Sequence, residues 1–319
     1  MIINIRLIAR IFWGLAAVIS PTCLALNISE LQPADYSNIK LLGSLQNSSL
    51  KEVSGITRST LNDKVFWVIN DGGDKPYIYA IDSNGKHLGR YFIRKVDNRD
   101  WEDISSYSKD GKHYLIIADT GDNDASHRDS FLWVVVEPNL DRYNPKKLNT
   151  LGVKQRIRFR YKDGPRDCEA IAVDLKKDRI LLLSKRTVPA VMYQLPISPD
   201  PKQRMLTAKP VAEVGNIPQP DFTFLLTNPF FGRYASQPTA MDISPDGSQL
   251  AILTYNYGYI YKLEEGQEWE QALKLKPLVF KLPELRQAEA LGFSQDGNII
   301  VTSEKRPAPL YIIEKTKSK

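Results

Sequence analysis

The chain has 319 residues, of which 42% are hydrophobic, 25% charged and 10% aromatic, as is typical of a globular protein. This composition excludes an intrinsically disordered chain, a collagen-like chain and a protein with several membrane spans. Lysine and arginine exceed aspartate and glutamate by 43 to 37. Because the basic residues are scattered in short clusters, the charge does not indicate a nucleic-acid-binding protein.

Residues 1–25 have the pattern of a secretory signal peptide. They contain two arginines and no acidic residue, and an apolar run follows at residues 11–19. The run is short for a membrane-spanning helix, and residues 23–25 offer small side chains at the two positions that signal peptidase recognises. The sequence therefore predicts cleavage after residue 25, a periplasmic or extracellular protein, and no stable membrane span after cleavage. An uncleaved anchor is the alternative.

Cleavage at this position leaves Cys168 as the only cysteine. The mature chain then has no internal disulfide bond, and its stability depends on core packing. Cys168 lies between Asp167 and Glu169 in an apolar stretch, and the two acidic neighbours disfavour a thiolate. We therefore expect Cys168 to have a packing role rather than a nucleophilic one.

Residues 26–319 contain a repeated pattern of short strands. Five segments open with a small or acidic residue in an apolar stretch: Ser54, Glu102, Glu169, Thr239 and Glu289. Each is followed by a continuous apolar run and then by a strand of alternating polarity, and three of the intervening turns read Ser-x-Asp-Gly. A fourth, more polar strand is expected after the first four units, at about residues 88–94, 150–161, 206–217 and 273–282.

The fifth unit lacks a fourth strand of its own. Residues 39–45 precede the first unit, match nothing else in the pattern, and are predicted to pair with the segment around residues 310–313. An N-terminal strand that completes the last unit closes a β-propeller and removes its open edges. The sequence therefore predicts an all-β, five-bladed β-propeller, formed by one domain at residues 26–319. Six blades are the alternative if the Pro- and Phe-rich insertion at residues 218–237 contains strands.

The first residues of the inner strands are candidates for a functional site, because these strands surround a central channel whose mouth commonly holds the ligand. Three of the five positions are carboxylates, at Glu102, Glu169 and Glu289. Like charges that converge on one axis repel each other unless a cation or protonation offsets them. These residues therefore predict a metal site. The alternative is that each glutamate hydrogen-bonds backbone groups of the next blade.

The loops after the second strands add further charged residues. Asp119 and Asp122 flank a glycine, and their oxygens suit a hard cation such as calcium, although any tight turn is rich in such residues. Basic pairs occupy equivalent positions in the third and fifth units: Lys185 with Arg186, and Lys305 with Arg306. We expect these four residues to bind phosphate or carboxylate oxygens of a ligand, or else to neutralise the glutamates of their own blades.

Other chemistries have little support in the sequence. There is no Gly-x-Ser-x-Gly elbow, phosphate-binding Gly-Lys-Ser loop or His-Glu-x-x-His segment. The lack of long amphipathic helices and of a Gly-rich βα unit argues against Rossmann, TIM-barrel and α/β-hydrolase folds. His127 is the one histidine near the acidic loop, and a surface position is the simpler interpretation of it.

Four segments, together with the Ser-Pro-Asp-Gly hairpin, resemble exported bacterial β-propeller proteins that are loosely similar to phytase-like and SMP-30/gluconolactonase-like propellers. The segments are residues 100–104, 118–123, 167–171 and 287–291. In those two groups, which usually have six blades, acidic residues at the channel mouth bind calcium or another divalent ion that supports hydrolysis of phosphoesters or lactones. The resemblance implies an acidic metal-binding rim formed by Glu102, Asp119, Asp122, Glu169 and Glu289.

Two functions are compatible with these features. The first is a binding protein whose acidic, calcium-binding channel mouth takes a small anionic ligand or a cell-envelope protein. The alternative is a metal-assisted hydrolase of a phosphoester, ester or lactone, in which Arg186 and Arg306 hold anionic oxygens. The lack of a convincing nucleophile or general base favours the binding protein.

Overall fold

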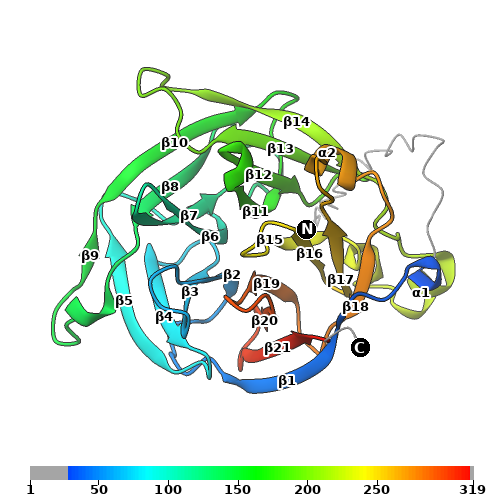
Figure 1. Cartoon of the computed structure of the whole chain (residues 1–319), viewed down its shortest axis with the longest axis horizontal. Helices are drawn as coiled ribbons and strands as arrows, with labels where there is room; N and C mark the ends of the chain where they lie inside the picture. The colour runs from blue at the N-terminus through cyan, green and yellow to red at the C-terminus, as the bar shows by residue number, and fades with distance from the viewer. Residues whose placement is uncertain (1–27, 317–319) are drawn as a thin grey trace, which may run out of the picture.

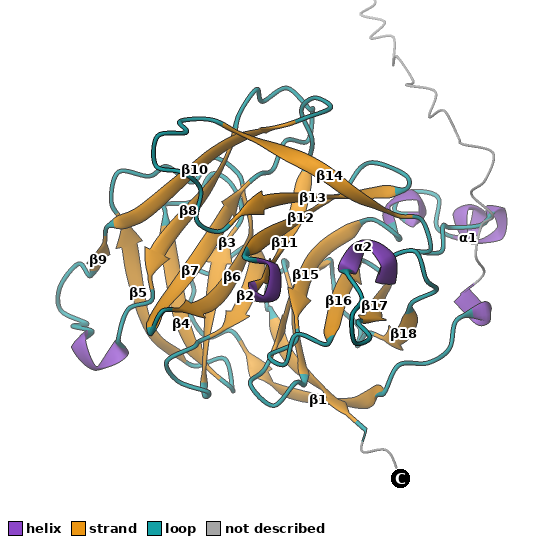
Figure 2. Ribbon diagram, turned by 45° about the horizontal axis from the view of Figure 1, so that its top comes forward, coloured by secondary structure: helices purple, strands orange, loops and turns teal. Residues whose placement is uncertain are grey.

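The computed structural model describes residues 28–316, so the predicted signal peptide lies outside the described residues. The described chain is all-β and has the radial arrangement of a β-propeller, with the strands of each sheet stepping outward from a central axis (Figure 1). Figure 2 shows short helices in the loops between these strands. None of the helices within residues 28–316 is long and apolar enough to cross a bilayer.

The strands form repeated four-stranded units. The inner strands are β2 (Val53–Arg58), β6 (Trp101–Lys109), β11 (Cys168–Asp174), β15 (Pro238–Ile243) and β19 (Ala288–Phe293). The second strands are β3 (Val65–Asn70), β7 (Lys112–Asp119), β12 (Arg179–Ser184), β16 (Gln249–Thr254) and β20 (Ile299–Ser303). The third strands are β4 (Tyr77–Asp82), β8 (Ser130–Val136), β13 (Ala190–Pro196), β17 (Tyr257–Lys262) and β21 (Pro309–Lys315). The outer strands are β5 (His87–Ile93), β10 (Val153–Tyr161), β14 (Leu206–Val214), β18 (Leu278–Lys281) and β1 (Tyr36–Ser44).

The inner strands contact one another in a closed cycle, in the order β2, β6, β11, β15, β19 and back to β2. Two units are also joined at their outer edges, because β10 pairs in parallel with β14 to form one eight-stranded sheet. The predicted strand at residues 150–161 is interrupted at Gly152, and its first part, β9 (Thr150–Leu151), pairs with β5 of the preceding unit. The outer edges therefore link neighbouring units as well.

The N-terminal strand closes the arrangement, as the sequence predicts. β1 pairs antiparallel with β21, with Ile39 opposite Ile313 and Gly43 opposite Leu310. The Thr316 N–H donates to the Asp35 carbonyl at 2.8 Å, so the end of β21 lies beside the residue that precedes β1. This pairing removes an open sheet edge.

The insertion at residues 218–237 contains helices and no strand. It forms α1 (Phe222–Thr227) and the 3₁₀ turn η4 (Gly232–Tyr234). The alternative of six blades depended on strands in this insertion, and the insertion has none. The remaining helices of the described chain are η1 (Ile28–Glu30), η2 (Leu140–Arg142), η3 (Leu175–Lys177) and α2 (Trp269–Ala272).

Apolar side chains fill the spaces between the units. All residues of β3, β12 and β16 are buried, in agreement with their continuous apolar sequences. Cys168 is buried without a disulfide partner, and burial raises the pKa of its thiol, with a smaller contribution from Asp167. The thiol is therefore a packing group, in agreement with the sequence analysis.

Candidate functional site

One local irregularity places all the inner-strand candidates. The pairing of each inner strand with its second strand shifts register near its start, between residues 53 and 55, 101 and 103, 168 and 170, 238 and 240, and 288 and 290. The residues left unpaired are Ser54, Glu102, Glu169, Thr239 and Glu289. A β-bulge redirects the side chain of the unpaired residue. The same bulge therefore orients the side chain at each of these five positions.

The hydroxyl residues at these bulges tie neighbouring units together. Ser54 Oγ donates to the Trp101 carbonyl at 2.8 Å, and Thr239 Oγ1 donates to the Ala288 carbonyl at 2.7 Å. Within residues 28–316, no backbone N–H donates to the side chain of any of the three bulge glutamates. Among the described residues, the glutamates therefore do not hydrogen-bond the backbone of the next unit, as the sequence analysis considered. At two other bulges, Ser54 and Thr239 make such bonds.

Glu102 lies at the centre of a group of carboxylates. One oxygen from each of Glu102, Asp167 and Glu169 lies within 4.8 Å of the others, and the same holds for Asp71, Asp100 and Glu102. We call these five residues the acidic cluster. All the side-chain ligand atoms that it offers are oxygens, which suit hard cations.

Glu102 has no compensating partner of its own. Its side chain is buried, with 7% of the residue exposed, and no described residue donates a hydrogen bond to its carboxylate. Burial, followed by the negative charge of Glu169, raises the pKa of Glu102 well above its ordinary value. A buried carboxylate in this setting needs either a proton or a cation.

Other carboxylates of the acidic cluster also have raised pKa values. Burial is the largest cause that raises the pKa of Asp71 to about 6, and it also raises the pKa of Asp100. Glu169 differs, because it accepts a hydrogen bond from Lys185 Nζ, and both side chains are 7% exposed. Burial alone would lower the Lys185 pKa, but the charge of Glu169 raises it on balance. Glu169 is thus part of an ion pair, whereas Glu102 is not.

Gly121, in the loop after β7, leaves space for the carboxylates of Glu102 and Asp100. A Cβ atom at this position would lie 2.1 Å from Glu102 Oε1 and 2.4 Å from Asp100 Oδ2. The Gly121 N–H donates to the Asp100 carbonyl at 3.2 Å, which holds the loop against the cluster. A side chain at this position would require the carboxylates of Glu102 and Asp100 to move.

Asp119 and Asp122 belong to neither group of converging carboxylates. Asp119 Oδ2 accepts from Trp133 Nε1 at 3.1 Å, and Asp119 Oδ1 accepts from the Asp100 N–H at 3.1 Å. Asp122 accepts from the N–H groups of Ser126 and His127 at 2.8 and 2.9 Å. Both carboxylates therefore organise the loop around the acidic cluster.

Glu289 lies beside the cluster rather than within it. Tyr255 donates its hydroxyl to Glu289 Oε1 at 2.6 Å and accepts from Lys185 Nζ at 3.0 Å. Burial, followed by the charge of Glu304, raises the pKa of Glu289 to about 7. Tyr255 thus links Glu289 to the Lys185–Glu169 ion pair.

The four basic residues singled out from the sequence are engaged with groups of the protein. Arg186 Nε donates to Asp167 Oδ2 at 2.6 Å, and Lys185 pairs with Glu169. In the last unit, Lys305 pairs with Glu304 at 2.6 Å, and Arg306 Nη1 donates to the Ser48 carbonyl at 3.2 Å. Lys185, Arg186 and Lys305 therefore neutralise carboxylates of their own units.

Sequence reasoning missed Asp71, Asp100 and Asp167 as members of the site. A signal was available for two of them, because Asp100 precedes Glu102 and Asp167 precedes Glu169 by the same two residues. Extending the comparison of the repeats to two residues before each glutamate would have found this Asp-x-Glu pattern. Asp71 lacks this pattern, but it directly follows the second strand β3, as the loop with Asp122 follows β7, so its place at a strand end was the available signal.

No family model and no curated protein sequence matches the chain. Solved structures similar to it include the PQQ-bound aldose sugar dehydrogenase of Streptomyces coelicolor, with 10% sequence identity and a TM-score of 0.48 over 88% of this chain and 100% of that chain. Another is the hydrazine synthase of Kuenenia stuttgartiensis, with 13% identity and a TM-score of 0.42 over 83% of this chain and 72% of that chain. The resemblance to phytase-like and SMP-30/gluconolactonase-like propellers stays a prediction from short motifs.

Proposed function

We propose that the protein is an exported, five-bladed propeller that binds a divalent cation, specifically calcium, in the acidic cluster, and there recruits a small anionic ligand or a cell-envelope protein. The blade number is inferred from the closed cycle of inner strands β2, β6, β11, β15 and β19. Export is inferred from the signal-peptide pattern of residues 1–25. N-terminal sequencing of the protein from a bacterial periplasm tests the predicted cleavage after residue 25.

The observation that carries the proposal is the uncompensated carboxylate of Glu102. It is buried, it accepts no hydrogen bond from a described residue, and it is shared by both groups of converging oxygens. A cation would neutralise several of these charges at once, whereas protons would have to be taken up one at a time at neutral pH. A cation is therefore a better counter-charge for the cluster than protons are.

Calcium fits the donor set better than zinc or magnesium. Zinc sites are usually built with histidine or cysteine, and the two groups contain only aspartate and glutamate. Magnesium requires a compact octahedral shell, whereas calcium takes six to eight oxygens in flexible geometry and accepts several carboxylates. The five side chains of the acidic cluster match the calcium pattern.

The binding role is favoured over the hydrolase because the basic groups at this mouth are already paired. Arg186 bonds Asp167 and Lys185 bonds Glu169, so neither is poised to hold an anionic oxygen of a substrate. Arg306 is directed to a backbone carbonyl of residue 48. An anionic group would then be held chiefly by the cation itself.

The test replaces Glu102 by Gln and follows thermal unfolding in EDTA and in calcium. In EDTA, Glu102→Gln should melt at a higher temperature than the wild type, because the amide is neutral without the proton that the buried Glu102 carboxylate must otherwise take up. Calcium should raise the melting temperature of the wild type by mass action, and its affinity for the variant should be about tenfold lower or weaker still.

Glu289→Gln is the matched control. Glu289 occupies the same bulge position, but it bonds Tyr255 and lies outside both converging groups. This variant should keep the wild-type calcium response. If calcium shifts neither the wild type nor the control, or shifts Glu102→Gln as much as the wild type, the cluster is not a calcium site.

A further inference from the structure

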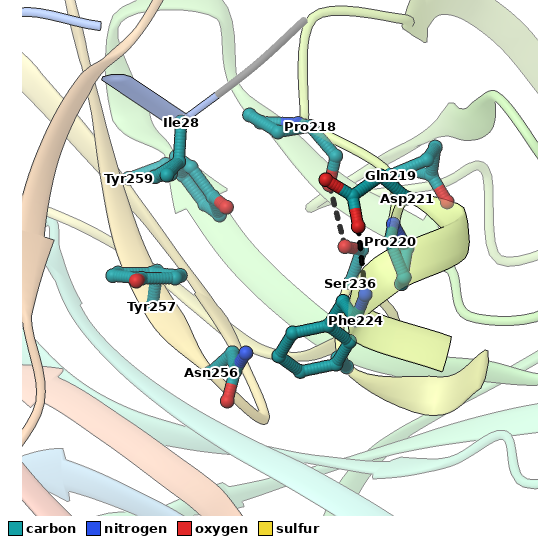
Figure 3. A pocket seen from close by; sticks show the side chains of 11 residues that line it. Ile28, Pro218, Gln219, Pro220, Asp221, Phe224, Ser236, Asn256, Tyr257 and Tyr259 are labelled. Atoms are coloured by element: carbon teal, nitrogen blue, oxygen red, sulfur yellow. Dashed lines mark hydrogen bonds between the residues drawn. The ribbon is translucent and has the colours of Figure 1, made fainter. Parts of the chain in front are cut away.

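A second cavity lies away from the acidic cluster, between the 218–237 insertion and strand β17 (Figure 3). Its volume is about 340 Å³, within the range of small-molecule sites. Tyr257 and Tyr259 project from β17 on one side, and Asp221 and Phe224 come from the insertion on the other. The insertion thus builds a cavity that the repeated strands alone would not form.

The lining of this cavity combines aromatic rings with a single negative charge. Phe224, Tyr257 and Tyr259 supply the rings, and Asp221 supplies the carboxylate. No lysine, arginine or histidine occurs among the described lining residues, although the whole chain carries a net charge of +6. The local electrostatics therefore favour a positively charged ligand.

We propose that this cavity binds a small organic cation of the quaternary-ammonium class. The faces of aromatic rings attract a weakly hydrated cation, and methylated ammonium groups also bury their apolar surface against the rings. A carboxylate nearby adds a second, longer-range attraction. A metal ion would need more than one charged oxygen ligand, and the one charged side chain that an anion would meet among the described lining residues, Asp221, is negative.

Asp221 is held in place by the helix that it begins. Its Oδ1 atom accepts from the Phe224 N–H at 2.7 Å and caps the N-terminus of α1. No described residue donates a hydrogen bond to Oδ2, so this oxygen is available to a ligand. The cap that orders the insertion therefore also fixes the carboxylate and the Phe224 ring relative to each other.

The cavity and the acidic cluster are separate, although one turn connects them. Tyr255 bonds Glu289 beside the cluster, whereas the next two residues, Asn256 and Tyr257, line the cavity. Binding of an organic cation does not require the calcium site. The two proposals can therefore fail independently.

The test uses isothermal titration calorimetry with choline and with 3,3-dimethylbutanol, its uncharged carbon isostere. Choline should bind at least about tenfold more tightly, because the isostere has the same shape but lacks the charge. Phosphocholine should bind more weakly than choline, since its phosphate meets no basic lining residue. This arm separates a free cation from a phosphate-linked headgroup.

Two variants examine the two parts of the site. Asp221→Asn retains the helix cap, because an asparagine oxygen still accepts the Phe224 N–H, and it should weaken choline binding several-fold. Tyr257→Leu keeps apolar volume and should weaken choline binding about tenfold by removing the ring. Asp200→Asn is the matched control, since Asp200 caps an exposed turn through the Lys202 N–H and does not line the cavity.

Melting temperatures establish that each variant is folded before binding is compared. Equal affinity for choline and 3,3-dimethylbutanol would overturn the proposal, as would choline binding that survives both cavity substitutions unchanged. Absence of choline binding to the wild-type protein would also overturn it.

Discussion

At the scale of single residues, the acidic cluster is defined by what surrounds Glu102. Two other carboxylates in the cluster have a cationic partner, since Glu169 pairs with Lys185 and Asp167 pairs with Arg186. Glu102 has no such partner in the described part of the chain, and the backbone of Gly121 lies against it. The protein therefore balances two of the five charges internally, and Asp71, Asp100 and the buried, central Glu102 have no cationic partner among residues 28–316.

Gly121→Ala should damage the cluster without changing any charged residue. The added methyl group would overlap Glu102 Oε1 and Asp100 Oδ2, at 2.1 and 2.4 Å, and overpacking of this kind costs about 1–3 kcal/mol. We expect a lower melting temperature and a weaker calcium response. Gly152→Ala is the control, because its Cβ would lie 3.7 Å from the nearest atom, Arg94 Nη2. A wild-type calcium response in Gly121→Ala would show that Glu102 and Asp100 can separate without cost.

The raised carboxyl pKa values predict how stability depends on pH. Asp71 has a pKa of about 6 and Glu289 of about 7 in the folded protein, against ordinary pKa values of 3.8 and 4.5. At pH values between the ordinary and the raised pKa of each group, the folded state binds more protons than the unfolded state. The free energy of unfolding therefore falls as pH rises through this range. In EDTA, the melting temperature should therefore decrease from about pH 5 to about pH 7.5.

Calcium should reduce the part of this dependence that comes from Asp71, because it replaces protons as the counter-charge in the acidic cluster. Asp71→Asn should reduce the slope in EDTA, since it removes one of the groups that take up a proton. Thermal unfolding at several pH values, with EDTA or with calcium, measures both effects. A melting temperature that rises with pH in EDTA would contradict the assignment.

The sequence identifies the bulge residues but not all of their neighbours. Glu102, Glu169 and Glu289 are found because each repeat places an equivalent residue at the same point of an inner strand. Only the contacts of the folded chain show that Glu289 is bonded to Tyr255 and that Asp71 joins Glu102. Side-chain partners across units depend on loop conformation, which the local sequence pattern does not encode.

At the scale of elements, hydrophobic patterning predicts the inner three strands of each unit better than the outer one. The inner strands are buried on both sides and have strong apolar runs, whereas an outer strand packs on one face only. The predicted strand at 273–282 is shorter in the structure, where β18 spans Leu278–Lys281 and the preceding segment follows α2. Likewise, β14 ends at Val214 rather than at residue 217.

The turns between inner and second strands follow the sequence more closely. Gly247 and Gly297, the last residues of two Ser-x-Asp-Gly turns, have φ values of +69° and +74°. These values lie in the left-handed region, which glycine enters without steric cost. A local backbone requirement is thus predictable from the sequence. The packing of the insertion is not, since Phe222 of α1 is apolar and yet 76% exposed.

At the scale of the whole molecule, closure by β1 should determine whether the chain folds. Removal of residues 28–45 would leave the edge of β21 unpaired and uncover part of the core against which Tyr36 packs. We expect this truncated protein to aggregate or to lose its cooperative thermal transition. Recovery of a soluble protein with wild-type melting would show that closure is dispensable.

A circular permutant supplies the matched control. A short linker from Thr316 to Asp35 would join β21 and β1 as a hairpin, because these residues are already hydrogen-bonded at 2.8 Å. The new termini would lie in the turn segment near Asn47. This permutant should melt close to the wild type, whereas the truncated protein should not.

The pairing of Ile39 with Ile313 also sets a condition on biosynthesis. The ribosome makes Ile313 long after Ile39, so the strand around Ile39 waits on the order of tens of seconds for its partner at typical synthesis rates. An interrupted translation product lacks the C-terminal partner and keeps a sheet edge that proteases and chaperones recognise. We therefore expect resistance to degradation to depend on synthesis of β21.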